Sequence, residues 1–148
     1  MAGPNQIARA LPALDITEAD LLEVHTGTRT EATFRHNIRV GVQYIEAWLR
    51  GSGCVPLYNL MEDAATAEIC RSQNWQWIRH GVTLDTGLVC TPALLRALCA
   101  EEMERVRGEI GETRFTGGRF DEAIRLFERL CIAPEFVEFL TLPAYDLL

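Results

Sequence analysis

The spacing of apolar residues constrains the fold of this 148-residue chain more than any other feature. In three long stretches, apolar side chains recur every three or four positions, which places them on one face of an α-helix. No alternation of apolar and polar residues competes to indicate a strand. We therefore predict an all-α fold built around these stretches: Phe34, Ile38, Val42, Ile45 and Leu49; Leu95, Leu98, Cys99, Met103 and Val106; Phe120, Ala123, Ile124, Phe127, Leu130 and Cys131.

Capping and breaking residues indicate where the helices begin and end. Threonine or aspartate is typical of a helix N-cap, and glycine commonly follows a helix C-terminus. Proline ends a helix or kinks it. These signals predict a short helix from Thr17 that stops before Gly27, then long helices from Thr30 to Gly51, from about Asp63 to His80, from Thr91 onward, and from Gly118 to Pro134.

The segments between and beyond these helices are expected to be irregular. Two glycines and a proline predict a turn over residues 51–59. Pro143 and Tyr145 argue against a helix in the C-terminal tail, TLPAYDLL, and its apolar side chains are expected to dock on this domain or on a neighbour. We interpret residues 1–16, which hold two prolines, as a linker. Residues 17–148 then form one domain, a bundle of about four to five helices.

Charge and composition exclude several classes of function. Twenty-one acidic and fourteen basic residues give a net charge of −7, which argues against a nucleic-acid partner or an anionic membrane surface. No apolar run approaches the roughly 20 residues of a membrane span, and no secretory signal is recognisable, so we expect a cytoplasmic protein. The five cysteines are widely spaced and lack a C-x-x-C pair, which favours reduced core thiols over disulfides or a zinc site.

Asp63 is the candidate catalytic residue that position alone suggests. It opens a helix directly after a turn, where free backbone N–H groups and the helix dipole favour a negative charge. Acidic residues at helix starts are, however, usually caps and nothing more. Glu62 points elsewhere as a sequence neighbour, and Cys54 on a glycine-containing loop is either a reactive thiol or a small buried side chain. Position therefore leaves the role of Asp63 open.

A longer pattern resembles a known enzyme family. Residues 36–81, which include the stretch NLMEDAATAEICR, are similar to the C-terminal region of malate synthases. The resemblance is strongest to the shorter, A-type enzymes. The likeness continues through Thr91, GGRFDEAIRLFERL and the closing FLTLPAYDLL. In that family a TIM barrel precedes a helical domain that covers the open side of the active site. The resemblance implies that this chain is such a domain and that its partner is the barrel.

The resemblance also implies a reaction and its residues. Malate synthases condense acetyl-CoA with glyoxylate to give malate and CoA, and the aspartate of the LMED motif, here Asp63, removes a methyl proton. Met61 matches a residue that lines the acetyl-CoA pocket, and Cys54 matches one close by. The family places its arginine and its carboxylate-bound Mg²⁺ on the barrel, so no metal ligand is predicted within this chain.

The chain is expected to be inactive alone, because the barrel residues are not encoded in it. Two further readings compete with that of a catalytic domain. A stand-alone helical module that binds another protein through its loop and tail is the alternative function. A purely structural domain without a ligand is the third reading, which the intact LMED motif argues against.

Overall fold

The computed structural model describes residues 15–24 and 26–148. The linker expected over residues 1–16 lies almost entirely outside the described residues, so the domain boundary stays a prediction. Across the described part of the chain, no helix is both long and apolar enough to cross a bilayer. The elements of these residues are α1 (Glu18–Leu22), α2 (Glu31–Leu49), β1 (Val55–Leu57), β2 (Leu60–Glu62), α3 (Ala64–Arg79), α4 (Pro92–Ile110), α5 (Glu112–Thr116), α6 (Phe120–Ile132) and α7 (Thr141–Tyr145).

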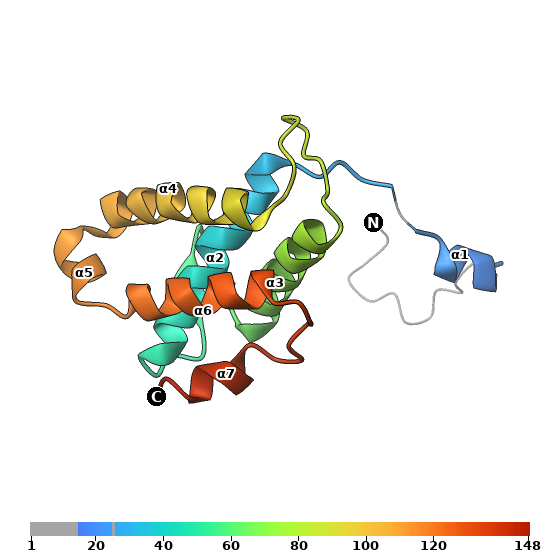
Figure 1. The fold of residues 1–148 in the computed structure, drawn as a ribbon. Helices are drawn as coiled ribbons and strands as arrows, with labels where there is room; N and C mark the ends of the chain where they lie inside the picture. Colours follow the sequence, from blue (N-terminus) through green and yellow to red (C-terminus); the bar gives the residue numbers. More distant parts are fainter. Residues whose placement is uncertain (1–14, 25) are drawn as a thin grey trace, which may run out of the picture.

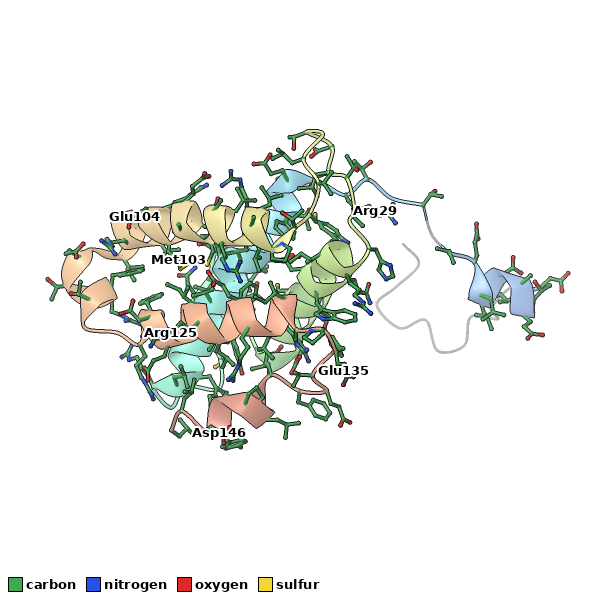
Figure 2. The ribbon with its side chains drawn as sticks, viewed as in Figure 1. Arg29, Met103, Glu104, Arg125, Glu135 and Asp146 are labelled. Carbon is green, nitrogen blue, oxygen red and sulfur yellow. The ribbon has the colours of Figure 1, made fainter. Side chains whose placement is uncertain are left out.

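Helix α2 lies at the centre of the bundle, and α3, α4 and α6 pack around it (Figure 1). The three predicted apolar stretches supply one continuous core. Of the residues in these stretches, only Ile124 is partly exposed. Met103, for example, projects from α4 into the space between α4 and α6 (Figure 2). The expected all-α bundle is confirmed, since these stretches bury one face each of α2, α4 and α6, and α3 packs against α2 and α6.

The approach of α6 to α2 depends on Gly41 in the middle of α2. A Cβ atom added at Gly41 would lie 2.2 Å from Cε2 of Phe127, a buried residue of α6. Glycine in a helix interior costs stability in isolation. Here it lets the Phe127 ring pack against the α2 backbone, and this packing fixes how closely α2 and α6 approach each other.

Side-chain caps confirm four of the predicted helix starts, whereas α6 begins without one. Thr17, Thr30 and Thr91 each accept a hydrogen bond from a backbone N–H of the first turn, and Asp63 caps α3 in the same way. The first helix ends at Leu22, before Gly27 as predicted. The caps satisfy backbone donors that have no partner inside the helix.

Residues 51–62 contain two short strands, so the expectation that the chain forms no strand is wrong. Strands β1 and β2 pair antiparallel, with Val55 opposite Glu62 and Leu57 opposite Leu60. Tyr58 and Asn59 form the two-residue turn and both have positive φ, at 51° and 68°. Three-residue strands are too short to show an alternating pattern, and the turn lacks the glycine that signals such hairpins.

The regions after α4 hold two short helices, of which α5 was not predicted and α7 lies within the C-terminal tail. Helix α5 lies between α4 and α6, in a segment too short for a periodic pattern. Helix α7 includes Pro143, and its occurrence corrects the non-helical reading of the tail. Proline is tolerated there because Pro143 lies in the first turn, where its missing N–H would have had no helical partner.

Candidate functional site

Asp63 lies on the surface between β2 and α3, and its two carboxylate oxygens have different environments. Oδ1 accepts hydrogen bonds from the backbone N–H groups of Ala65, at 2.9 Å, and Thr66, at 3.2 Å. Among the described residues, Oδ2 accepts no hydrogen bond. The cap therefore holds the carboxylate in place through one oxygen and leaves the other available to a proton.

The hairpin brings the three predicted site residues together. Met61 precedes Asp63 by two residues, and its side chain is 66% exposed. Cys54 lies next to Val55, which pairs with Glu62, so the register sets Cys54 across the hairpin from Asp63. Cys54 is exposed as well. The sequence separation of Cys54 and Asp63 did not indicate this neighbourhood, because it depends on the strand pairing.

Contacts to α2 and α3 hold the hairpin on the bundle. Leu57 packs in a small buried cluster with Val40 of α2 and Cys70 of α3. The hydroxyl of buried Tyr44 donates to the Gly53 carbonyl at 3.2 Å. Burial raises the pKa of Tyr44, and the charges of Asp63 and Cys54 raise it further, so Tyr44 remains a donor at neutral pH. Pattern reading missed Tyr44, because a tyrosine on a buried helix face looks like core.

The C-terminal tail is bonded to α3 close to Asp63. Glu68 accepts from the Leu140 backbone N–H at 2.7 Å and pairs with the buried Arg71 at 2.6 Å. Arg71 in turn donates to the Glu138 carbonyl at 3.1 Å. These bonds place α7 beside the start of α3 (Figure 1). The expectation that the tail docks on this domain is confirmed.

Several exposed apolar side chains lie on the elements next to Asp63. They come from the hairpin, from α3 and from the docked tail, and they are Leu60, Met61, Ile69, Leu142 and Tyr145. A large contiguous apolar surface is typical of a site of contact with another surface. Because Asp63 itself is exposed, any wall that shields it from water must come from residues outside the described part of this chain.

Metal ligands do not gather in this domain. Within residues 15–24 and 26–148, no three His, Cys, Asp or Glu side chains are placed so that they could hold a metal ion together. The resemblance assigns the Mg²⁺ of the family to the barrel, and these residues offer no group of side chains that fits it.

The cysteines differ sharply in their surroundings, although all five are free thiols. Burial raises the pKa of Cys70 and Cys99 to about 12 and that of Cys90 to about 11. Burial also raises the pKa of Cys131. The prediction of reduced core thiols is confirmed for these four, whereas Cys54 is exposed.

One thiol is therefore expected to react rapidly with a disulfide reagent in the native chain at about pH 8, and all should react after denaturation. A raised pKa leaves the buried thiols almost without thiolate, and packing blocks access to them. The measurement is a stopped-flow thiol titration, and Cys54→Ser is the matched control that should abolish the fast phase. A fast phase that persists in Cys54→Ser would contradict the burial of the other four.

Comparison with known proteins adds the family. The family model described as malate synthase, C-terminal, matches residues 28–148. The chain belongs to this family. The matched region holds α2 to α7 and all three site residues, so the malate synthase resemblance of the LMED segment is confirmed at the level of the family.

Individual malate synthases are similar over nearly the whole chain. The malate synthase of Oryza sativa is 56% identical over 98% of this chain. That of Myxococcus xanthus is 55% identical over 100% of it, and malate synthase A of Escherichia coli is 56% identical over 90%. The chain spans 27%, 27% and 25% of these three proteins, respectively.

Proposed function

We propose that this chain acts as the C-terminal domain of a malate synthase, with Asp63 as the base that removes a methyl proton from acetyl-CoA. The free Oδ2 of Asp63 carries this proposal, because a base must be held in place and still have an oxygen open to the proton. The relatives are named malate synthases, and the family resemblance supplies the proposed reaction, the condensation of acetyl-CoA with glyoxylate.

The position of Asp63 suits a carboxylate that is held ready for the substrate. Two backbone N–H groups and the N-terminal end of the α3 dipole favour a negative charge. After the proton has moved to Oδ2, the bonds to Oδ1 still hold the side chain. Met61 is the middle residue of β2 and Cys54 directly precedes β1, and we assign both to the wall of the acetyl-CoA pocket.

The second half of the chemistry lies outside this chain in our proposal. A proton beside a thioester carbonyl is weakly acidic, so the base works only if the enolate oxygen is stabilised at the same time. The family resemblance assigns that stabilisation to a barrel arginine and a barrel-bound Mg²⁺. Since the described residues offer no metal site, no step assigned to this chain passes through the ion.

The exposed apolar side chains beside Asp63 support a barrel as the partner. Leu60, Met61 and Leu142 are each more than half exposed, which is costly unless another surface covers them. Docking the barrel on the hairpin and tail would bury these side chains and exclude water from the enolate. The same side chains also suit the alternative, a module that binds an unrelated protein.

The decisive experiment compares this chain alone with a chimeric enzyme, which we call the joined enzyme. In the joined enzyme, the chain replaces the matching C-terminal part of E. coli malate synthase A, to which it is 56% identical. We expect the joined enzyme to form malate and the 148-residue chain alone to give no turnover. The assay follows thiol release from acetyl-CoA with glyoxylate and Mg²⁺.

Two controls make the comparison informative. The parent E. coli enzyme sets the upper limit, and its remainder without any C-terminal part should be inactive. A folded joined enzyme without activity, beside an active parent, would contradict the catalytic proposal and favour the binding module. Turnover by the chain alone would contradict the assignment of half the site to the barrel.

A further inference from the structure

Tyr58 adopts a backbone conformation that a bulky side chain rarely tolerates. It occupies the first position of the two-residue turn between β1 and β2, with φ of 51°. The second position holds Asn59, with φ of 68°, and asparagine is one of the few residues that enters this region readily. A strained residue persists only where its surroundings hold it, and such residues cluster at functional sites.

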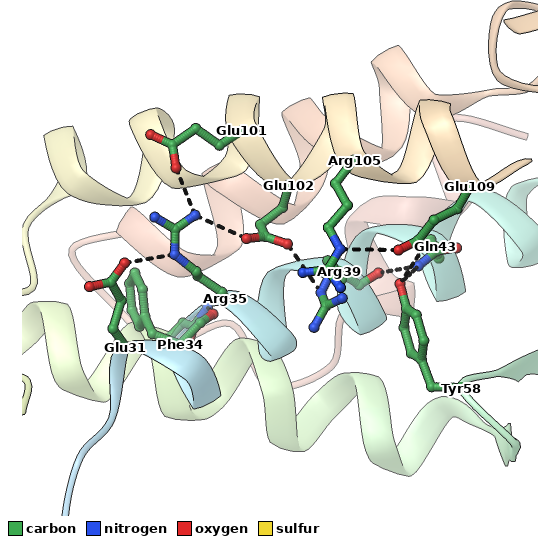
Figure 3. A network of polar contacts seen from close by, with 11 residues as sticks. Glu31, Phe34, Arg35, Arg39, Gln43, Tyr58, Glu101, Glu102, Arg105 and Glu109 are labelled. Carbon is green, nitrogen blue, oxygen red and sulfur yellow. Dashed lines mark hydrogen bonds and ion pairs between the residues drawn. The ribbon is translucent and has the colours of Figure 1, made fainter. Parts of the chain in front are cut away.

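The Tyr58 side chain is held by two helices (Figure 3). Its hydroxyl accepts from Gln43 Nε2 of α2 at 3.0 Å and donates to Glu109 Oε2 of α4 at 3.2 Å. The Arg39 guanidinium lies over its ring, 4.9 Å from the centroid. Burial raises the pKa of Tyr58, which keeps the hydroxyl protonated as a donor to Glu109. These contacts offset the strain of the turn.

The held turn is connected directly to Asp63. Strand β2 contains only Leu60 to Glu62, and Asp63 is the next residue. Just before β1, the hydroxyl of Tyr44 donates a hydrogen bond to the Gly53 carbonyl. Gln43 and Tyr44 are consecutive residues of α2, so one turn of this helix holds both ends of β1, the strand that pairs with β2 and so positions Met61 and Asp63.

We propose that Tyr58 is a positioning residue for Asp63, which it serves by holding the hairpin turn on α2 and α4 through Gln43 and Glu109. The inference rests on the proposed function of Asp63 and adds a residue that never touches the substrate. A carboxylate that shifts by about 1 Å can lose as much as roughly 10²-fold in rate. The position of β2, and of the Tyr58 turn that precedes it, therefore contributes to the rate.

Two substitutions of Tyr58 in the joined enzyme separate position from stability. Tyr58→Phe keeps the ring but removes both hydroxyl bonds, and we expect kcat to fall about 10-fold with KM for acetyl-CoA changed less than about 2-fold. Tyr58→Asn relieves the turn, since asparagine accepts positive φ, yet it removes the whole contact. We expect its thermal midpoint to equal or exceed that of the wild type while kcat falls at least as far as in Tyr58→Phe.

Partner and control variants complete the test. Gln43→Met removes the donor to Tyr58 at similar side-chain length, and the pair Tyr58→Phe with Gln43→Met should lose little more kcat than either single variant. Thr86→Val is the matched control. It removes a hydroxyl hydrogen bond to the carboxylate of Glu31, near the N-terminal end of α2, and kcat should not change.

The outcomes distinguish this inference from the function on which it rests. Wild-type kcat in both Tyr58 variants would overturn the positioning role, and so would losses that only follow the thermal midpoint or appear mainly in KM. If Asp63→Asn also retains activity, the proposed function itself fails. If Asp63→Asn is inactive while the Tyr58 variants are normal, only the positioning role is lost.

Discussion

Asp63→Asn is expected to lower kcat of the joined enzyme by roughly 10²–10⁴-fold, the usual contribution of a positioned general base. Asparagine has nearly the same shape but cannot accept the proton at Oδ2. Its amide oxygen can still accept from Ala65 and Thr66, because asparagine and aspartate are similarly good helix caps. We therefore expect the free energy of unfolding of the chain to change by less than about 0.5 kcal/mol.

A second substitution at the same position separates the two roles of this carboxylate. Asp63→Ala removes the base and the cap together, so it should lose activity and also destabilise the chain by about 1 kcal/mol. Steady-state kinetics of the joined enzyme and chemical denaturation of the chain measure the two effects. Retained turnover in Asp63→Asn would remove Asp63 from the mechanism, whatever its role as a cap.

Gly41→Ala is expected to produce the largest loss of stability from a single added methyl group. The new Cβ would lie 2.2 Å from Cε2 and 2.8 Å from Cδ2 of Phe127, well inside van der Waals contact. Phe127 is fully buried, so its ring cannot move aside without disturbing the core. Overpacking of this kind costs about 1–3 kcal/mol. Thermal and urea unfolding of the chain measure it.

The matched control is Gly108→Ala, the same substitution in α4. Nothing lies within 4 Å of a Cβ added at Gly108, which is exposed. Alanine should therefore stabilise α4 by up to about 1 kcal/mol, through helix propensity. Phe127→Leu combined with Gly41→Ala should recover part of the loss, because the ring atoms that clash are removed. Equal effects at Gly41 and Gly108 would show that α2 and α6 do not approach as described.

A cluster of charged groups around the buried Glu46 fixes the C-terminal end of α2, and no sequence pattern indicates this cluster. The Glu46 side chain is 2% exposed and accepts from both terminal nitrogens of Arg114, at 3.0 and 2.6 Å. It also accepts from the Arg119 backbone N–H at 3.2 Å. A buried carboxylate needs such partners. In the sequence, Glu46 looks like an ordinary solvent-facing residue of an amphipathic helix.

The helices and the position of Asp63 were predictable because their signals are local. Apolar spacing places one face of α2, α4 and α6 in the core, and threonine or aspartate caps mark where helices begin. Both effects act over a few neighbouring residues, so they are legible without the fold. The sequence also predicted Asp63 as a cap, and the resemblance to malate synthases suggested its role as a base.

Only the tertiary structure decided how the site is assembled. Pairing of Val55 with Glu62 brings Cys54 across from Asp63, and the turn that makes this pairing possible depends on Tyr58, held by Gln43. Strand pairs of three residues carry too little pattern to predict their partners, and the strain at Tyr58 is offset by helices distant in sequence. By itself, the sequence determined the four long helices and the cap. The pairing and packing of distant segments decided which residues surround Asp63 and which of its oxygens is free.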